Sequence, residues 1–186
     1  MPEKIKSKNP EQIRFIVGLG NPGNEYKNTF HNIGSLAVDY LTKENLNFRR
    51  SPKTKNFEYL RANNLIFVRP LTFMNESGIA VRQALQYFKI KPVEILIIHD
   101  DSDIELGKYK LSFGRGSAGH KGIESIIKNL KTKKFWRLRL GVKTTGQKIK
   151  AGVLVLKKIS APTQKIFQKV FEEVNKNIIS QNSKLA

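Results

Sequence analysis

A short apolar run that ends in a glycine-rich turn is the sequence feature that most constrains the fold of this chain. Residues 13–17 read Ile-Arg-Phe-Ile-Val, and residues 18–23 read Gly-Leu-Gly-Asn-Pro-Gly. A buried strand that ends in such a turn delivers side chains to the open edge of a sheet, where α/β proteins place their binding sites. Asn21 lies within the turn, and His31 precedes an apolar-periodic segment that predicts a helix. An imidazole and a carboxamide at this edge suggest general-base chemistry beside an oriented carbonyl group or water.

The glycines of this turn also match G-x-G-x-x-G, the fingerprint of dinucleotide-binding folds. In a true fingerprint the helix begins at the third glycine, and its N-terminus binds the pyrophosphate. Here the residues after Gly23 are polar, and no apolar helical face begins before Ile33. The acidic residue expected at the end of a second strand is also missing, because Asp39 falls within the helical pattern. The pattern therefore disfavours a nucleotide-binding fold.

The spacing of strand and helix patterns predicts a single α/β domain, with a twisted, mixed and mainly parallel sheet flanked by helices. A chain of 186 residues suits one well-cored domain rather than two. We expect residues 1–12 to form a flexible leader and residues 13–186 to form the domain. The predicted strands cover residues 13–17, 57–62, 65–69, 94–99, 109–113 and 135–142. The predicted helices cover residues 36–41, 80–88, 123–130 and 162–179, and residues 47–56 are expected to be a basic, polar connector.

The strongly basic composition favours a polyanionic partner. The formal net charge is +19, and the sequence pI is about 10.2. Counterion release from phosphates would supply affinity with little sequence information. A general bias of the composition towards lysine is the alternative explanation.

The chain has no cysteine, which excludes disulfides, a thiolate nucleophile and cysteine-based zinc sites. No apolar stretch approaches the ~20 residues that span a bilayer, and the charged N-terminus lacks the apolar segment of a secretion signal.

A cluster of aspartates directly follows the buried strand pattern of residues 94–99. The cluster contains Asp100, Asp101 and Asp103, at the end of a strand where sites form in α/β proteins. A calcium loop is disfavoured, because no glycine or glutamate has the required spacing. From the pattern alone, a solvated turn and a functional carboxylate both stay open. His99, inside the strand, is predicted to be a structural histidine rather than a ligand.

The glycine-rich turn and the residues after it closely resemble the start of the bacterial-type peptidyl-tRNA hydrolase family. That family combines G-L-G-N-P-G and a tyrosine three residues on with T-R-H-N-x-G. This chain has the same turn, then Tyr26, and then T-F-H-N-I-G with Phe30 in place of the arginine. Residues 72–78 and 99–103 resemble two further family motifs, T-[FY]-M-N-x-S-G and H-D-x-x-D. The resemblance extends from Ile13 to the C-terminal helix.

The resemblance assigns roles to several residues. It implies that His31 is the catalytic base and that Asp100 orients it, because a carboxylate on one ring nitrogen fixes the tautomer and stabilises the imidazolium. It implies that Asn21 and Asn75 orient the peptide and donate hydrogen bonds towards the developing oxyanion. Spacing alone would instead make Asn75 a helix N-cap. The other substrate-contacting positions of the family fall on Tyr26, Phe73 and Met74.

A glycine-rich loop at residues 114–122 departs from the family pattern. The family's loop reads G-S-A-G-G-H-N-G, which places His120 on its histidine and Lys121 on its site asparagine. Lysine can donate but not accept, so we expect Lys121 to contact RNA phosphate rather than to position the attacking water. The role of His120 stays open between capping the loop and contacting RNA. A basic position of the family falls on Ser112. The basic residues expected to hold the 5′-phosphate of the tRNA are Arg139 and, as local supplements, Lys108, Lys110 and Arg115.

The resemblance implies a metal-independent hydrolase without a cofactor, which cleaves the ester between the peptide and the ribose in peptidyl-tRNA. The implied partner is the acceptor end of peptidyl-tRNA, and we expect a cytoplasmic monomer without membrane contact. Residues 151–158 are the stretch where the family has its flexible lid. The alternative is a non-catalytic RNA-binding protein on the same scaffold, as in chloroplast group II intron splicing factors. Lys121 and the basic charge favour that alternative, whereas the intact set of four catalytic positions disfavours it.

Overall fold

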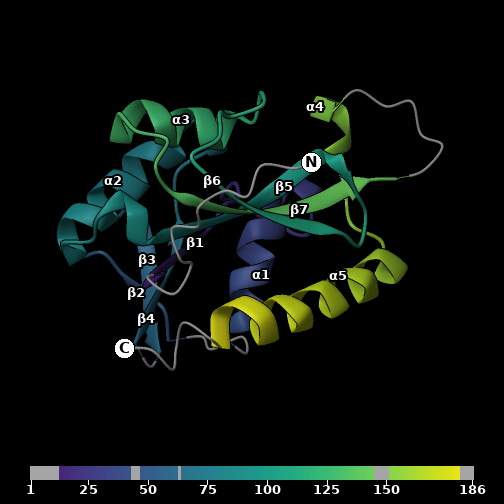
Figure 1. Ribbon diagram of the computed structural model, residues 1–186, viewed down its shortest axis with the longest axis horizontal. Coiled ribbons are helices and arrows are strands. Elements are labelled where there is room, and N and C mark those ends of the chain that lie inside the picture. Colours follow the sequence, from purple (N-terminus) through teal and green to yellow (C-terminus); the bar gives the residue numbers. More distant parts are fainter. Residues whose placement is uncertain (1–12, 43–46, 63, 145–150, 181–186) are drawn as a thin grey trace, which may run out of the picture.

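The computed structural model describes residues 13–42, 47–62, 64–144 and 151–180. The predicted leader at residues 1–12 lies outside the described residues, as do residues 145–150 and Asn63, which separates the strands predicted at 57–62 and 65–69. The described residues form a sheet with helices on both faces (Figure 1). No helix in this part of the chain is long and apolar enough to cross a membrane.

One sheet of seven strands runs through the middle of the described structure, in the order β2-β3-β4-β1-β5-β7-β6. The central strands β4, β1, β5 and β7 are parallel, whereas β2, β3 and β6 pair antiparallel at the two sides. The predicted α/β fold with a mixed sheet is therefore confirmed, with the parallel strands at its centre. The strands are β1 (Phe15–Gly18), β2 (Arg49–Arg50), β3 (Phe57–Ala62), β4 (Leu65–Pro70), β5 (Ile95–Glu105), β6 (Tyr109–Phe113) and β7 (Trp136–Lys143).

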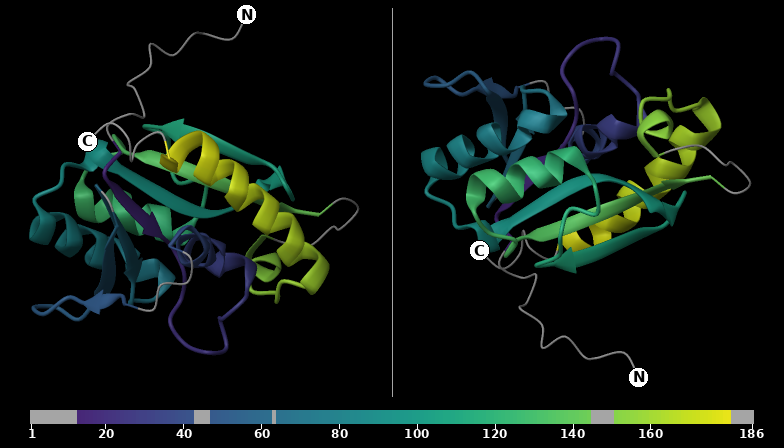
Figure 2. Two further views of the ribbon diagram at one scale, coloured as in Figure 1. Left: turned by 90° about the horizontal axis from the view of Figure 1, so that it is seen from below. Right: turned by 90° about the horizontal axis from the view of Figure 1, so that it is seen from above.

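Helices cover both faces of the sheet. Helices α2 and α3 lie on one face, and α1 and α5 lie on the other; in Figure 2, α5 is in front of the strands in the left view and α3 in the right view. The short helix α4 lies at the end of the molecule where the candidate site is found (Figure 1). The α-helices are α1 (Ile33–Leu41), α2 (Ser77–Phe88), α3 (Lys121–Leu130), α4 (Ala151–Leu154) and α5 (Ala161–Val174). The short 3-10 helices are η2 (Phe30–Asn32), η3 (Met74–Glu76) and η4 (Pro92–Glu94), and a π-helical turn, η5 (Asn175–Ile179), follows α5.

Two hydrophobic cores lie on opposite faces of the sheet. Along β1, Ile16 packs into the core beneath α1 and α5, whereas Phe15 and Val17 pack into the core beneath α2 and α3. This division follows from the alternation of side chains along a strand. All three side chains are fully buried. A strand buried on both faces needs an almost continuous apolar run, which is what the sequence of β1 and of the first half of β5 provides.

The structure corrects several details of the sequence-based prediction. The connector at residues 47–56 contains the edge strand β2, whose exposed arginines carry no apolar pattern. The helix predicted at residues 162–179 is α5 followed by the π-helical turn. The N-cap of α2 is Glu76, without a side-chain bond, so the reading of Asn75 as the cap was wrong. Of the two possibilities left open for the aspartate cluster, the structure excludes a solvated turn, because β5 continues through it to Glu105.

A close contact between α1 and the sheet fixes the start of this helix. A Cβ atom added at Gly34 would overlap the carbonyl group of Ile98, and one added at Gly18 would overlap the carbonyl group of Gly34. Main-chain bonds reinforce the contact, since Ser35 donates to the carbonyl oxygen of Leu19 at 2.9 Å. Only glycine permits such an approach of two backbones. The packing brings η2, immediately before α1, beside the middle of β5.

Candidate active site

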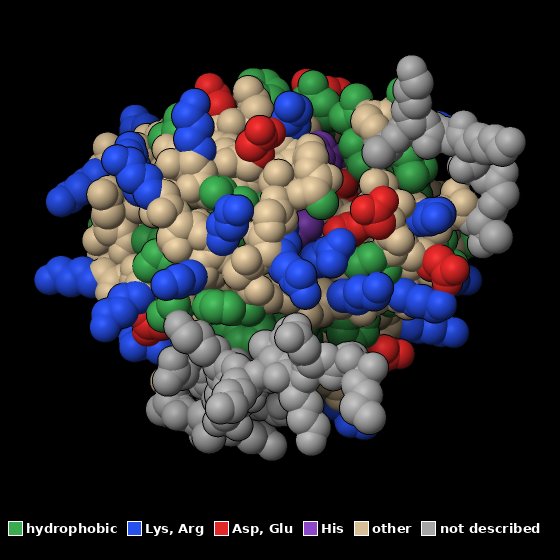
Figure 3. Space-filling view, turned by 45° about the horizontal axis from the view of Figure 1, so that its top comes forward, with side chains coloured by type: hydrophobic (Ala, Val, Ile, Leu, Met, Phe, Trp, Pro, Cys, Tyr) green, Lys and Arg blue, Asp and Glu red, His purple; other side chains and the backbone are tan. Residues whose placement is uncertain are grey.

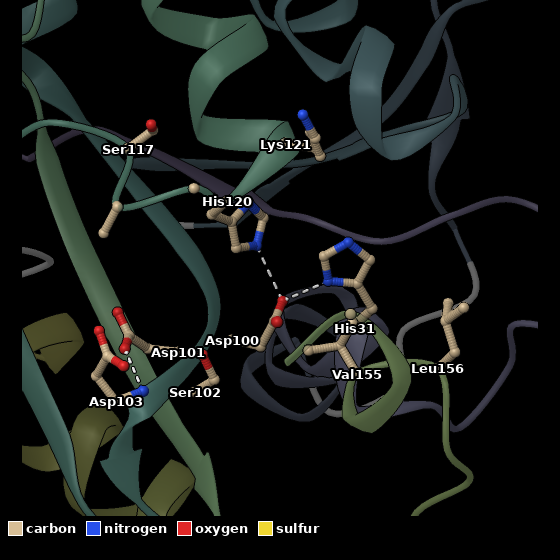
Figure 4. A pocket seen from close by; sticks show the side chains of 13 residues that line it. His31, Asp100, Asp101, Ser102, Asp103, Ser117, His120, Lys121, Val155 and Leu156 are labelled. Carbon is tan, nitrogen blue, oxygen red and sulfur yellow. Dashed lines mark hydrogen bonds and ion pairs between the residues drawn. The ribbon is translucent and has the colours of Figure 1, made fainter. Parts of the chain in front are cut away.

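Three side chains from three different elements meet at the edge of the sheet. Asp100 comes from β5, His31 from η2 ahead of α1, and His120 from the N-cap position of α3. The imidazoles therefore reach Asp100 from the two opposite helical layers. The Asp100 side chain is 3% exposed, compared with 13% for His31 and 9% for His120. Figure 4 shows both rings directed at the same carboxylate.

The pair formed by His31 and Asp100 has the geometry of an oriented general base. Nδ1 of His31 lies 2.9 Å from Oδ1 of Asp100. An ionised carboxylate only accepts hydrogen bonds, so Nδ1 carries the proton and Nε2 is the basic nitrogen. His31 also lines the pocket beside this carboxylate. A neutral imidazole in this tautomer can remove a proton from a group in the pocket, while Asp100 stabilises the resulting cation.

His120 uses both of its ring nitrogens. Its Nδ1 accepts hydrogen bonds from the backbone N–H groups of Gly122 and Ile123, at 3.1 and 3.3 Å. Because those partners can only donate, Nδ1 is unprotonated and the proton is on Nε2. Nε2 then donates to Oδ1 of Asp100 at 3.0 Å. The sequence left the role of His120 open between capping and RNA contact. The structure shows that His120 caps α3 and also donates a hydrogen bond to the carboxylate of Asp100.

The two histidines keep Asp100 ionised. Burial alone raises the pKa of this carboxyl group, because it disfavours the charged form. The interactions with His120, followed by those with His31, outweigh that effect and hold the pKa of Asp100 well below its usual range. The carboxylate is thus available to both rings as an acceptor at neutral pH.

His99 completes a cluster that contains all three histidines of the chain. Its ring lies 4.7 Å from the ring of His120, which in turn lies 5.0 Å from that of His31, measured between centroids. Nδ1 of His99 donates to the carbonyl oxygen of Asp100 at 2.7 Å. Burial, followed by the proximity of His120, lowers the pKa of His99 well below its usual value, so the ring is neutral. Its 1% exposure agrees with the predicted structural role.

The His31, Asp100 and His120 side chains also have the composition of a metal site. One ligand atom from each lies within 4.8 Å of the other two. Coordination by Nε2 of His120 would require moving its proton to Nδ1, which faces two backbone N–H groups. That tautomer would place donors against donors at the start of α3. The hydrogen-bond pattern therefore fits a metal-free carboxylate that is shared by two imidazoles.

A pocket of about 430 Å³ opens beside these residues. One wall is formed by Asp101, Ser102 and Asp103 and another by the loop at 117–121, while Gly152, Val155 and Leu156 close the third side. Histidine side chains are visible in this hollow in Figure 3. The exposed apolar side chains Val153 and Leu156 belong to the stretch expected to be the lid. We call this cavity the active-site pocket.

A second depression, the basic groove, lies next to the active-site pocket and shares Ala118 with it. Its volume is about 490 Å³. Lysine and arginine side chains gather on this face of the molecule in Figure 3. Such a groove suits a phosphate backbone. Its polar lining is formed by Lys110, Ser112, Arg115, Arg137 and Arg139.

The two arginines of β7 have different environments within the basic groove. Arg137 is buried, and its Nη1 donates to the carbonyl oxygen of Gly116 at 2.8 Å. Burial, followed by the nearby charge of Arg139, lowers the pKa of Arg137. Arg139 is more exposed, and its Nε donates to Oδ2 of Asp101 at 2.7 Å. Arg137 therefore anchors the glycine-rich loop, while Arg139 connects the groove to the wall of the active-site pocket.

Asn21 lies in the loop that leads from β1 to η2, outside the lining of the active-site pocket. Its Oδ1 accepts a hydrogen bond from the backbone N–H of Met74 at 2.7 Å. The Nδ2 group is thereby the part of the amide that can donate elsewhere. Asn32 holds the backbone of Asn21 from both sides, with distances of 2.8 and 2.9 Å. These two hydrogen bonds give Asn32 a structural role that was not predicted from the sequence.

The other predicted substrate contacts lie in varied surroundings. Asn75 is exposed in η3. Phe73 is 50% exposed and contacts the ring of Tyr26 edge-on, at 6.3 Å. Met74 is 4% exposed and belongs to the core beneath α2 and α3. None of these four side chains is among the residues that line the active-site pocket.

The remaining predicted tRNA contacts are Lys108 and Lys121. Lys121 lines the active-site pocket at the first turn of α3, with its ammonium group directed away from the histidines (Figure 4). Its Nζ lies 3.6 Å from Glu124, and its side chain is 72% exposed. Lys108 is paired with Glu105 at 2.5 Å and lies outside the lining of the basic groove. Both lysines are thus paired with a glutamate on the surface, and the pair of Lys121 is the longer of the two.

Sequence reasoning missed several contacts of the site region. Arg137 falls within the strand predicted at residues 135–142, and nothing in its spacing predicts a bond to Gly116. The bond between His120 and Asp100 was also missed, although the position of His120 just before a helix was a usable signal for its cap. Main-chain contacts of His31 with Val155 have no signature in side-chain patterns.

Comparison with known proteins places this geometry in context. The family model described as peptidyl-tRNA hydrolase matches residues 15–184. The peptidyl-tRNA hydrolase of Sulfurihydrogenibium sp. (strain YO3AOP1) is 39% identical over 171 residues, which cover 90% of each chain. That of Lactobacillus delbrueckii subsp. bulgaricus is 45% identical over 134 residues, covering 70% of this chain and 72% of the relative. The crystal structure of peptidyl-tRNA hydrolase from Acinetobacter baumannii has a TM-score of 0.80 at 28% identity, covering 96% of this chain and 92% of that chain.

Proposed function

The chain belongs to the peptidyl-tRNA hydrolase family, and we propose that it hydrolyses the ester bond between peptide and tRNA in peptidyl-tRNA. The reaction would release a free peptide and a free tRNA that can return to translation. The observation that carries the proposal is the 2.9 Å contact between Nδ1 of His31 and Oδ1 of Asp100 at the active-site pocket. The neighbouring basic groove supports a tRNA substrate, because it offers several cations to a phosphate backbone.

In the proposed mechanism His31 is the general base. Its Nε2 removes a proton from a water molecule as the water oxygen attacks the ester carbonyl carbon. The imidazolium that forms is stabilised by Asp100 through Nδ1. Collapse of the tetrahedral intermediate breaks the bond to the ribose oxygen, which takes up the proton from His31. A general base of this kind contributes about 10²–10⁴-fold to the rate.

We propose that Asn21 and Asn75 orient the peptide and donate hydrogen bonds to the developing oxyanion. For Asn21 the support is its fixed amide, because Met74 occupies Oδ1 and leaves Nδ2 to donate. The exposed position of Asn75 leaves its amide accessible to a substrate. Loss of one oxyanion donor typically lowers kcat by about 10²–10³-fold.

Binding of the tRNA is assigned mainly to the basic groove. Lys110, Arg115 and Arg139 line it, and the 5′-phosphate of the acceptor end is the group expected to contact Arg139. Lys121, at the rim of the active-site pocket, would add a phosphate contact closer to the scissile ester. We propose that the reaction needs no cofactor, since these residues suffice for acid–base hydrolysis. We also propose that the protein is a cytoplasmic monomer.

Turnover of a purified peptidyl-tRNA tests the proposal directly. We expect the wild-type protein to release free tRNA, and His31→Ala to lower kcat by at least ~10²-fold without loss of folded structure. Asp100→Asn should cause a similar or smaller loss, by leaving the imidazole misoriented. Circular dichroism of both variants provides the control for folding. Binding of tRNA by the wild-type protein without ester cleavage would favour the alternative, a non-catalytic RNA-binding protein.

A further inference from the structure

We propose that His120 is a positioning residue for His31 and that it acts through their shared carboxylate, Asp100. The inference rests on the proposed function, because it assigns His120 a part in the chemistry of the same site. Its basis is that Nε2 of His120 and Nδ1 of His31 contact one oxygen atom of Asp100, at 3.0 and 2.9 Å. His120 itself need not touch the reacting atoms.

The cap at the start of α3 explains only half of this geometry. Capping requires one acceptor for the free N–H groups of the first turn, and asparagine, aspartate or serine supplies it well. The Nδ1 atom of His120 performs that task with Gly122 and Ile123. The Nε2–H group is not needed for the cap, yet it is aimed at a buried carboxylate. A ring with two separate nitrogens joins the helix start to Asp100.

A second hydrogen-bond donor restricts the rotation of a carboxylate that a single donor would leave free to turn. A carboxylate held by a single N–H can rotate about its own bonds and carry the partner ring with it. At Asp100 the two N–H groups come from opposite layers, His31 from before α1 and His120 from the start of α3. Together they fix the direction of Oδ1 and hence the orientation of the His31 ring. Small misplacements of a catalytic group cost up to about 10²-fold in rate.

The surroundings also fix His120. Its ring packs edge-on against His99 with 4.7 Å between centroids, and His99 is tied to the carbonyl oxygen of Asp100. The loop ahead of it is tied to β7 through Arg137 and Gly116. The ring is therefore held by α3, by β5 and, through its loop, by β7. A side chain held by this many contacts is suited to fixing the orientation of a neighbouring group.

Two substitutions separate the cap from the contact with Asp100. The amide of His120→Asn reaches the position of Nδ1, so it keeps an acceptor for the cap but loses the donor to Asp100. The longer His120→Gln places its amide near the position of Nε2, so it keeps a donor to Asp100 but loses the cap. Ser160→Ala is a matched control, because Ser160 caps α5 through the N–H of Thr163. It weakens a helix start without touching the histidines.

The proposal predicts opposite patterns for activity and stability. For His120→Asn we expect kcat to fall by about 10- to 100-fold, with KM and Tm little changed. For His120→Gln we expect kcat within a few-fold of wild type and a Tm lower by about 2–4 °C, as for Ser160→Ala. If kcat instead followed Tm across the three variants, His120 would be a cap and nothing more, and the proposal would be overturned.

A measurement without substrate keeps the inference separate from the proposed function. In ¹⁵N-labelled protein, NMR reports the Nδ1 proton of His31. We expect its signal to be sharp in the wild type and in His120→Gln, and broadened by exchange with water in His120→Asn. An unchanged signal in His120→Asn would refute the positioning role, whatever the wild-type protein does to peptidyl-tRNA. An inactive wild type with the expected signals would refute the proposed function alone.

Discussion

The backbone N–H of His31 donates to the carbonyl oxygen of Val155 at 2.7 Å, which joins the candidate base to the segment that closes its pocket. Neighbouring bonds extend this contact, since Phe30 donates to Lys157 at 3.1 Å and Ile159 donates to Asn28 at 2.7 Å. The backbone position of His31 is thus set by a segment more than a hundred residues away in the sequence, as well as by α1.

The first prediction concerns Lys121, where the chain departs from the family pattern. Lys121→Ala should weaken tRNA binding and reduce the slope of log K against log salt by about 1, with kcat little changed. The physical reason is the loss of one phosphate contact from an exposed ammonium group. Lys121→Asn should preserve activity or raise it, because asparagine can both donate and accept. Titration of tRNA at several salt concentrations measures the slope.

Lys169 provides the matched control for this titration. It is an exposed lysine on α5, on the face of the sheet opposite to α3. Lys169→Ala removes the same charge from the chain, so a general effect of net charge would appear equally in both variants. Parallel lines for Lys121→Ala and the wild type would mean that Lys121 touches no phosphate.

The second prediction concerns the pH dependence of stability. The folded state holds His99 neutral, with a pKa well below 6.5, whereas the unfolded chain binds a proton near pH 6.5. Because the unfolded state then binds more protons, the contribution of His99 to the free energy of unfolding falls as the pH drops below about 6.5 and is constant above it. The slope attributable to one such histidine is at most about 1.4 kcal/mol per pH unit.

His99→Asn should remove this contribution while keeping a donor for the carbonyl oxygen of Asp100. Urea unfolding between pH 8 and pH 5 measures the effect as a flatter dependence in the variant than in the wild type. Both proteins share all other titrating groups, so the difference between the two curves isolates His99. Identical slopes would show that His99 is not held neutral in the folded protein.

The third prediction concerns the packing of α1 against β5. Gly34→Ala should lower the free energy of unfolding by about 1–3 kcal/mol, because its methyl group would overlap the carbonyl group of Ile98. Activity should fall as well, since η2 and His31 directly precede this contact. Gly116→Ala is the control, because a Cβ at that position meets open space. It should change stability by no more than about 0.5 kcal/mol, as measured by urea unfolding.

The strongly patterned elements were predictable from the sequence, whereas the contacts between distant residues were not. β3 and β6 begin and end where the alternating patterns predict, because alternation marks a strand with two different faces. β2 was not predictable, since two exposed arginines at a sheet edge carry no apolar signal. The extension of β5 through the aspartates was missed because buried carboxylates resemble turn residues until their partners are known.

The site was predictable only in part, for a related reason. His31 and Asp100 are 69 positions apart, and no periodicity connects them; the family resemblance alone paired these residues before the structure did so at 2.9 Å. The hydrogen bond from His120 to Asp100 could not be predicted from residue spacing either, because it depends on how α3 packs on the sheet. Catalytic roles for Asn21, Asn75 and the basic residues stay predictions that the variants above and the turnover assay address.

The arrival of the two histidines from opposite helical layers has a consequence for heat inactivation. Alignment of Asp100 needs both hydrophobic cores to be packed at the same moment, since η2 precedes α1 and His120 starts α3. Loosening of either layer would release one of the two donors while most of the secondary structure persists. Local openings of this kind require less free energy than global unfolding. The catalytic lifetime of the protein at high temperature is then set by its weaker layer rather than by its overall melting point.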